Sequence, residues 1–229
     1  MSAYGESTID LLHRVLDAGV EHAVVLMRHS AREFAPDRHD LMNPLTEEGR
    51  RLARQLGGRL PKNLTLRGYA SPPERCMETA SLVLEGHTAE GGQATRHRPL
   101  EALGVFYALD QMKMWKGMQQ AGGLVPYLQS WVSGQVPDDT MMPADIAAGL
   151  ILRVLTDKLD APVARRQLDV CVSHDMTLYL LRDRLLQEAV HGPEVAFLDG
   201  LVLYRQDGVI WMTSHHGEPR PVSGPPDSH

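Results

Sequence analysis

Apolar and polar positions along the chain follow the patterns of buried strands and amphipathic helices in turn. Residues 23–27, Ala-Val-Val-Leu-Met, form an uninterrupted apolar run that is typical of a strand covered on both faces of a sheet. Residues 168–173, Leu-Asp-Val-Cys-Val-Ser, indicate a second strong strand, and residues 64–70 a shorter one. Strands that are separated by helical segments favour an α/β fold with a mainly parallel sheet.

Helical spacing and turn signals place the remaining elements. Ser7 is expected to cap a helix over 7–19, and Thr46 to cap a helix over 47–56. Pro72-Pro73 breaks the chain before another helix. The other predicted elements are helices at 74–84, 105–118, 124–132, 144–159 and 176–189, a strand at 94–100, and a hairpin of 201–204 with 209–212 through Asp207-Gly208.

One segment without strand signals, residues 105–142, is expected to be a helical cap insertion over one edge of the sheet. It holds five of the eleven methionines, together with Tyr107 and Trp115. Such side chains could line a pocket for an organic substrate group, and packing between helices is the alternative explanation. Residues 1–215, including this cap, are predicted to form one domain, and residues 216–229, rich in Pro, Gly and Ser, a flexible C-terminal tail.

Composition and charge exclude several function classes. The chain has 229 residues, of which 43% are hydrophobic and 23% charged, as in an ordinary globular domain. The net charge is −6 and no Lys/Arg-rich run is present, so nucleic acid is not an expected partner. No apolar run reaches the roughly 18 residues that span a bilayer, and residues 1–16 lack the apolar core of a signal peptide. A cytoplasmic protein without a membrane partner is therefore expected, and its oligomeric state is open.

Cysteine and histidine usage gives no sign of a metal centre. Cys76 and Cys171 are too few for a disulfide framework and are interpreted as small buried hydrophobic residues. The eleven histidines include the pair His215-His216, but no HExxH, CxxC or short-spaced Cys/His array occurs. We therefore expect no metal site and no cofactor.

Charged residues follow each of three predicted strands. They are Arg28, His29 and Arg32 after the first strand, Arg75 in the first turn of the helix after the second, and His174-Asp175 after the third. Parallel strands bring their carboxyl ends to one edge of the sheet, where α/β proteins bind their ligands. Guanidiniums and the amides of a helix N-terminus bind anions. The pattern predicts a phosphate site with an imidazole nucleophile or base inside it.

These motifs resemble the histidine phosphatase superfamily, which includes the cofactor-dependent phosphoglycerate mutases. Residues 26–32, Leu-Met-Arg-His-Ser-Ala-Arg, are similar to its Arg-His-Gly start, and residues 71–80, Ser-Pro-Pro-Glu-Arg-Cys-Met-Glu-Thr-Ala, to its Ser-x-x-x-Arg-x-x-x-Thr-Ala helix entry. Residues 43–49, Asn-Pro-Leu-Thr-Glu-Glu-Gly, and residues 173–178, Ser-His-Asp-Met-Thr-Leu, are similar to further family motifs. The resemblance covers nearly the whole chain order and implies a three-layer α/β/α sandwich.

By this resemblance His29 is the catalytic nucleophile, and the phosphoryl group binds to Arg28, Arg32, Arg75 and His174. A neutral imidazole, with an ordinary pKa of ~6.5, is nucleophilic near neutral pH and can form a phosphoramidate. Arginines stabilise the equatorial phosphoryl oxygens without a metal ion. The expected activity is metal-independent hydrolysis of a phosphomonoester, either a small phosphorylated metabolite or a phosphopeptide.

One carboxyl group must protonate the leaving alkoxide and later activate a water molecule. Asp175 is the preferred candidate, because Arg32 and the His174-Asp175 pair both resemble the acid-phosphatase-like branch of the superfamily. Glu101, in Pro-Leu-Glu-Ala-Leu-Gly, resembles the acid/base region of the mutase-like branch and is the alternative. Free aspartic acid is ionised at pH 7, so an Asp175 acid predicts activity that improves below neutrality.

Two other functions are open at this point. One is a phosphoglycerate-mutase-like phosphotransferase, and the other is a catalytically inactive phosphoryl-binding regulatory module. Ser30 departs from the family pattern, which usually has glycine after the histidine. Its Cβ and hydroxyl are expected to change the backbone conformation or the width of the pocket.

Overall fold

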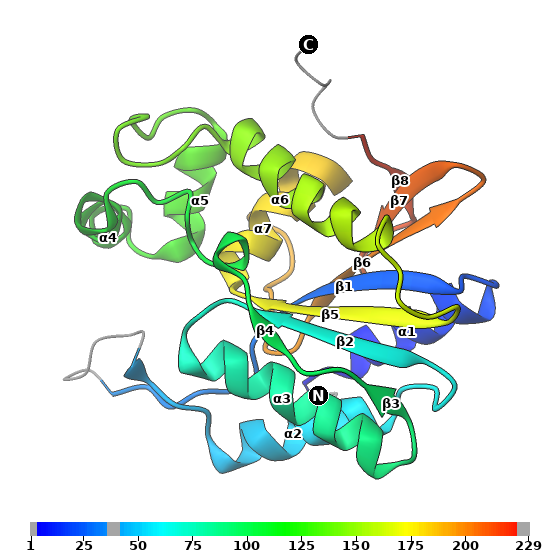
Figure 1. The fold of residues 1–229 in the computed structure, drawn as a ribbon. Coiled ribbons are helices and arrows are strands. Elements are labelled where there is room, and N and C mark those ends of the chain that lie inside the picture. The colour runs from blue at the N-terminus through cyan, green and yellow to red at the C-terminus, as the bar shows by residue number, and fades with distance from the viewer. Residues whose placement is uncertain (1–3, 36–41, 224–229) are drawn as a thin grey trace.

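The computed structural model describes residues 4–35 and 42–223, which form an eight-stranded sheet with helices on both faces (Figure 1). The strands are β1 (His22–Arg28), β2 (Thr65–Ala70), β3 (Gln93–Ala94), β4 (Arg98–Pro99), β5 (Gln167–Ser173), β6 (Gly200–Gln206), β7 (Val209–Thr213) and β8 (Arg220–Pro221). The helices are α1 (Glu6–Asp17), α2 (Glu47–Gly58), α3 (Glu74–Ala89), α4 (Gln111–Gln120), α5 (Leu124–Val132), α6 (Ala144–Leu159), α7 (Asp175–Leu186) and the short 3₁₀ helix η2 (Glu101–Leu103).

The strand order is β3-β2-β5-β1-β6-β7-β8, with β4 also paired to β2. The pairs among β1 to β5 are parallel, whereas β6, β7 and β8 pair antiparallel with their neighbours. The α/β fold with a mainly parallel sheet is therefore confirmed. The predicted hairpin of β6 and β7 is also confirmed. Asp207 (φ 52°) and Gly208 (φ 78°) have the two positive φ angles that a two-residue type I′ turn requires.

Alternating side chains of the central strands belong to two hydrophobic cores. Val24 and Leu26 of β1 face the core formed with α5, α6 and α7. Val25 and Met27 of the same strand face the core formed with α1, α2 and α3. Figure 1 shows the sheet between these two helix layers. The predicted three-layer α/β/α sandwich is confirmed, and burial on both faces explains why the strand sequence is apolar without interruption.

The parallel register places three strand ends side by side. Arg28 at the end of β1 pairs with Ser173 at the end of β5, and Ala70 at the end of β2 pairs with Val172. Because these strands run in the same direction, the segments that follow them meet at one edge of the sheet (Figure 1).

A buried carboxylate joins the same three strands inside the sheet. Asp169 of β5 is fully buried, and its Oδ2 lies 2.8 Å from His22 Nε2 of β1 and 2.9 Å from both Arg67 Nη2 of β2 and Gln167 Nε2. Burial alone would raise the pKa of Asp169, but the hydrogen bonds from His22, Arg67 and Gln167 hold it below its ordinary value. This ionic network fixes the order of β1, β5 and β2.

Several predicted boundaries were wrong. Gly5, not Ser7, is the N-cap residue of α1, because the Ser7 hydroxyl donates to Asp199 Oδ1 (3.0 Å) instead. The predicted strand over 94–100 is two separate two-residue strands, β3 and β4. Helix α4 begins at Gln111 rather than at residue 105, because the Asp110 side chain accepts hydrogen bonds from the amides of the first turn.

The predicted flexible tail over 216–229 contains an ordered strand. In β8, Arg220 pairs with Met212 and Pro221 with Trp211 of β7, so the sheet continues into this segment. Residues 224–229 lie outside the described residues.

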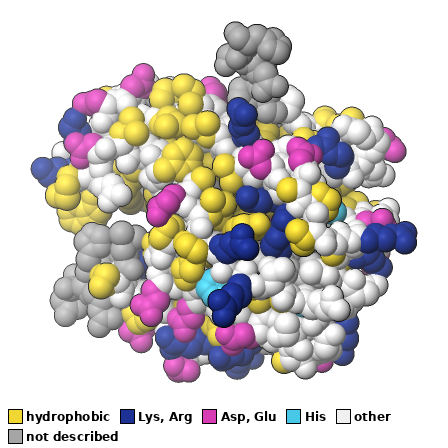
Figure 2. Space-filling model, viewed as in Figure 1, with side chains coloured by type: hydrophobic (Ala, Val, Ile, Leu, Met, Phe, Trp, Pro, Cys, Tyr) yellow, Lys and Arg dark blue, Asp and Glu magenta, His cyan; other side chains and the backbone are white. Residues whose placement is uncertain are grey.

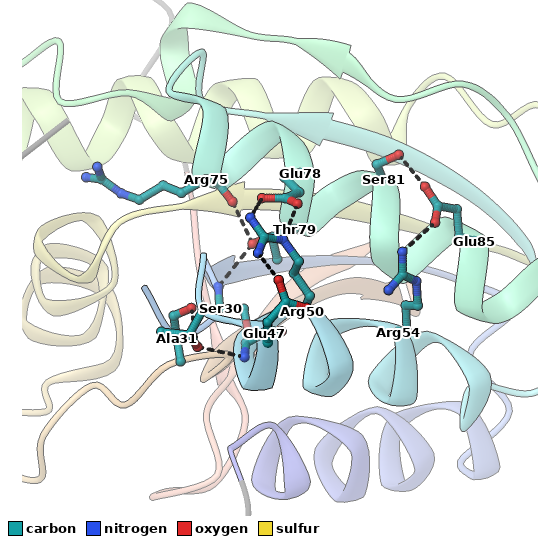
Figure 3. A network of polar contacts seen from close by, with 12 residues as sticks. Ser30, Ala31, Glu47, Arg50, Arg54, Arg75, Glu78, Thr79, Ser81 and Glu85 are labelled. Atoms are coloured by element: carbon teal, nitrogen blue, oxygen red, sulfur yellow. Dashed lines mark hydrogen bonds and ion pairs between the residues drawn. The ribbon is translucent and has the colours of Figure 1, made fainter. Parts of the chain in front are cut away.

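Close packing of α2 on α3 depends on a glycine. A Cβ on Gly57 of α2 would lie 1.9 Å from the Val83 carbonyl O of α3, so only glycine allows the two backbones to approach in this way. Arg50 of α2 and Glu78 of α3 form an ion pair (Nε to Oε1, 2.7 Å) along the same interface (Figure 3). These contacts hold α3, whose first turn carries Arg75, against α2.

We expect Gly57→Ala to lower the free energy of unfolding by about 2 kcal/mol, because the new methyl group meets backbone that cannot rotate away. Gly58→Ala is the matched control, since its Cβ would lie 3.4 Å from the flexible Glu90 side chain. Alanine in place of a helical glycine is expected to stabilise by about 0.5–1 kcal/mol there. Urea unfolding of both variants measures the difference, and equal destabilisation by both would contradict the backbone-contact explanation.

Candidate active site

Three segments that are distant in sequence meet at the carboxyl edge of β1, β5 and β2. His29 follows β1, and its amide donates to the Ser173 carbonyl O at the end of β5 (3.0 Å). Ser71 follows β2, and its amide bonds to β5 in the same manner (2.9 Å). His174 follows β5 and is the N-cap residue of α7. His29, Arg75 and His174 are only 3%, 4% and 5% exposed, so the edge carries a buried polar site.

The hydrogen bonds of His29 define which ring nitrogen can act as a nucleophile. Nδ1 lies 2.9 Å from the Ser30 carbonyl O, which only accepts, so Nδ1 carries the proton. Nε2 accepts a hydrogen bond from Arg75 Nε at 3.1 Å, and an arginine only donates. Both contacts require the neutral tautomer with its proton on Nδ1. The lone pair of Nε2 therefore points toward the Arg75 guanidinium.

The surroundings of His29 keep its imidazole unprotonated. Burial lowers the pKa of His29 well below its ordinary value, and the positive charge of Arg75 lowers it further. His174 and Arg28 act in the same direction, while the hydrogen bond to Ser30 opposes them. At neutral pH the Nε2 lone pair is thus available, and the site favours an anion over an additional cation.

Arg28 is held by three different contacts. Nη1 donates to the Val195 carbonyl O (2.7 Å), Nη2 pairs with Asp175 Oδ2 (3.0 Å), and Cζ lies 4.1 Å from the centroid of the Phe197 ring. Its Nε is buried and has no hydrogen-bond partner among the described residues. A buried donor without an acceptor is costly, so a phosphoryl oxygen fits beside this Nε.

His174 links the ends of β2 and β5. Its Nε2 lies 2.9 Å from Ser71 Oγ, and its ring centroid is 5.7 Å from that of His29, at an angle of 74°. Cys76 Sγ lies 3.9 Å from the same Nε2. Burial raises the pKa of the Cys76 thiol to about 12, so this cysteine is protonated and serves as a buried packing residue.

Both candidate acid/base residues are at this edge of the sheet. Asp175 is the first residue of α7, and its carboxylate contacts Arg28 directly. Glu101 is exposed and begins η2; it follows Leu100, whose amide donates to the carbonyl O of Ala70 at the end of β2 (2.8 Å). Asp175 is thus in contact with Arg28, and Glu101 lies on the β2 side of the same edge.

Arg32 lies in the loop after β1. Its Nη1 donates to the Glu33 carbonyl O (3.1 Å), and its Cζ is 5.7 Å from the centroid of the Phe34 ring. A bridge between Arg32 and Leu45 holds this loop beside the start of α2. A phosphate-binding role for Arg32 stays a prediction.

Part of the sequence is similar to a known protein family. Residues 24–99 match the family model described as the histidine phosphatase superfamily (branch 1). This stretch, which carries Arg28, His29 and Arg75, is similar to the histidine phosphatase superfamily. The closer relationship to the acid-phosphatase-like branch, predicted from His174-Asp175, is not confirmed. No curated protein matches the chain.

Several solved structures have a similar fold at low sequence identity. Phosphoglycerate mutase from Bacillus anthracis str. Sterne is 18% identical, with 84% of this chain and 91% of that chain covered and a TM-score of 0.55. Phosphoserine phosphatase from Entamoeba histolytica in complex with 3-phosphoglyceric acid is 18% identical, with coverages of 88% and 95% and a TM-score of 0.53. Mycobacterial glucosyl-3-phosphoglycerate phosphatase is 16% identical, with coverages of 88% and 97% and a TM-score of 0.52.

Ser30, directly after His29, joins the loop that follows β1 to two helices. Its Oγ donates to the Gly49 carbonyl O of α2 (2.7 Å), and its amide donates to Thr79 Oγ1 of α3 (3.1 Å). Thr79 Oγ1 in turn donates to the Arg75 carbonyl O (2.7 Å), and Figure 3 shows the Arg75 side chain extending away from this network. Ser30 does not have a positive φ, so its Cβ is accommodated without the backbone change expected from replacing glycine.

The sequence interpretation missed residues 195–199, which lie against Arg28 and His29. Val195 provides the carbonyl for Arg28, and the Phe197 ring centroid lies 5.9 Å from that of His29. The sequence Val-Ala-Phe-Leu-Asp has no motif that marks a site, and Val195 is 167 positions from Arg28 along the chain.

Among the described residues, no group of three or more His, Cys, Asp or Glu could hold a metal ion. Nor does that part of the chain contain a helix long and apolar enough to span a membrane.

We expect Ser30→Ala to lower the free energy of unfolding by about 1 kcal/mol, the typical contribution of one hydrogen bond, as measured by urea unfolding. Phosphomonoester hydrolysis should fall by less than about tenfold, because every charged group of the site is retained. Ser81→Ala is the matched control, since Ser81 Oγ donates to the exposed Glu85 of its own helix (2.9 Å). An equal loss of stability in both variants would show that the hydrogen bond from Ser30 to Gly49 does not contribute more than an exposed one.

Proposed function

We propose that this protein is a metal-independent phosphomonoester hydrolase that forms a phosphohistidine on His29 Nε2. The hydrogen bonding of His29 carries this proposal, because it selects the neutral tautomer and directs the Nε2 lone pair at a guanidinium. A phosphoryl group that binds to this guanidinium brings its phosphorus within reach of Nε2. Arg28 Nε and His174 supply further donors for the equatorial oxygens.

The proposed reaction has two balanced steps. First, Nε2 attacks phosphorus, the N–P bond forms as the ester P–O bond breaks, and the leaving alkoxide takes a proton from the Asp175 carboxyl group. Asp175 then removes a proton from water, whose oxygen attacks phosphorus and returns the N–P electron pair to Nε2. The Nδ1 proton, bonded to the Ser30 carbonyl, stays in place and supports the positive charge of the phosphorylated ring. Arg75 exchanges its bond to Nε2 for a phosphoryl oxygen.

The proposed substrate is a small phosphorylated metabolite or a phosphopeptide. The Entamoeba histolytica phosphoserine phosphatase has been solved with phosphoserine and with 3-phosphoglyceric acid. In this chain, residues 105–142 are proposed to cap the site and contact the organic part of the substrate. The Tyr107 hydroxyl lies 2.9 Å from Thr177 Oγ1, which ties the start of this segment to α7. Met112 and Trp115 of α4 are exposed and offer apolar contact area, and Figure 2 shows hydrophobic side chains gathered on the face around α4 and α5. A cytoplasmic location is part of the same proposal.

A phosphoenzyme is expected when the protein is mixed with a phosphomonoester and quenched in alkali. The phosphoryl group bound to the protein should be acid-labile and base-stable, and it should be absent from His29→Ala. Turnover of this variant should fall by about 10³-fold or more, because the nucleophile is lost. His13→Ala is the matched control, since His13 is exposed on α1. Label that persists in His29→Ala would contradict the proposal, and phosphate binding without turnover would identify a regulatory module. Transfer to a second phosphoglycerate hydroxyl would identify a mutase.

The leaving-group dependence of kcat/KM distinguishes Asp175 from Glu101. Asp175→Asn is expected to reduce kcat/KM for phenyl phosphate by about 10²-fold or more, and for p-nitrophenyl phosphate much less, because p-nitrophenolate leaves without a proton. Loss of the ion pair to Arg28 alone would reduce kcat/KM equally for the two substrates. The ratio of the two kcat/KM values therefore reports proton donation to the leaving group. Glu101→Gln should leave the ratio unchanged. The reverse result, with a changed ratio in Glu101→Gln only, would assign the acid to Glu101.

A further inference from the structure

The Phe197 ring lies between the phosphate site and the N-terminal segment of the chain. One side of the ring stacks on the Arg28 guanidinium, with Cζ 4.1 Å from the ring centroid, and the His29 ring lies 5.9 Å away. Tyr4, just before α1, packs edge-on against Phe197 with a centroid distance of 5.4 Å. A single aromatic side chain therefore contacts both the nucleophile and a phosphate-binding arginine.

We propose that Phe197 is a positioning residue that sets phosphate affinity by fixing the plane of the Arg28 guanidinium, and that α1 holds Phe197 in place through residues 195–199. This proposal rests on the proposed phosphate-binding role of Arg28. It assigns to Phe197 and α1 a function in the reaction that neither the motifs nor the fold indicates.

The contacts of Arg28 explain why a ring is needed. The bonds to Val195 O and Asp175 Oδ2 hold the two terminal nitrogens, but they leave the guanidinium able to tilt about the line that joins them. A ring stacked on the face of the guanidinium opposes this tilt by dispersion and cation–π attraction. Nε, which has no partner among the described residues, is then kept in one direction. Because the Arg28 Nε–H already points in one direction, phosphate binding does not have to immobilise this group, and the affinity for phosphate is higher.

Residues 195–199 are themselves held tightly. Leu198 has a φ of 62°, in the left-handed region that leucine rarely adopts. Its carbonyl O accepts a hydrogen bond from Thr8 Oγ1 of α1 (2.7 Å). Asp199 accepts from Ser7 Oγ of α1 (3.0 Å) and from the Ala196 amide (2.7 Å). These bonds support the unusual backbone conformation and fix Phe197 relative to α1.

The test measures binding of inorganic phosphate by calorimetry and steady-state kinetics with p-nitrophenyl phosphate. Phe197→Leu, which keeps apolar volume but removes the ring, is expected to weaken phosphate binding by about tenfold and to raise KM similarly, with kcat changed by less than about threefold. Phe197→Tyr restores the ring and should return both values to within about threefold of the unsubstituted protein. Thr8→Val, which removes only the hydroxyl that holds Leu198, should weaken binding by about threefold.

Phe106→Leu is the matched control for binding of inorganic phosphate, which has no organic group that residues 105–142 could contact. It makes the same change of side chain at a ring that packs edge-on against Tyr107 (5.4 Å). It should leave phosphate binding unchanged. Phosphate binding that is unaltered in Phe197→Leu, or equally weakened in Phe106→Leu, would overturn the proposal, as would the absence of phosphate binding to the unsubstituted protein. If phosphate binds and Phe197→Leu weakens it, but no phosphoenzyme forms, the positioning role stands and the proposed hydrolase function fails.

Discussion

The in-register ends of three parallel strands are the constraint on which the site depends. A slip of one residue between β1 and β5 would turn the β1 side chains toward the opposite cores and separate His29 from the end of β5. The apolar side chains of both faces oppose such a slip, because each belongs to a different core. Asp169 opposes it as well, since this buried carboxylate bonds to Arg67 and lies 2.8 Å from His22 on the flanking strands. Residues remote from the candidate site therefore determine where its side chains lie.

Burial at this edge links phosphate binding to nucleophilicity. The whole chain has a net charge of −6, yet Arg75 has the largest charge effect on His29, and Arg28 acts in the same direction. In a buried site charges are poorly screened, so both arginines attract an anion, in the proposed function a phosphoryl group, more strongly than they would in water. The same burial lowers the pKa of His29 and keeps its lone pair available. Exposure of the site to water would weaken both the attraction of the anion and the lowering of the His29 pKa.

The sequence predicted the parts of the site that follow strands. His29, Arg75 and His174 could be placed together because strand periodicity and chain direction bring their positions to one edge, and the structure brings them together. Phe197 could not be found in this way, because its contact with Arg28 depends on a loop conformation with a positive φ at Leu198. Ser7 had the residue type of a helix cap, but a tertiary partner, Asp199, takes its hydroxyl. Sequence patterns for helix caps fail where a residue distant in the chain binds the hydroxyl of the expected cap.

The ion pair between Arg28 and Asp175 couples substrate binding to proton transfer in the proposed mechanism. Without substrate, the Asp175 carboxylate balances the charge of the Arg28 guanidinium at 3.0 Å. A phosphoryl group that binds to the same guanidinium would lie beside this carboxyl group, so the leaving alkoxide would form within its reach. Proton transfer to the alkoxide needs this short approach. An arginine shared between substrate and acid thus places the phosphoryl group next to Asp175, whereas Glu101, which is exposed, has no contact with Arg28 that would do so.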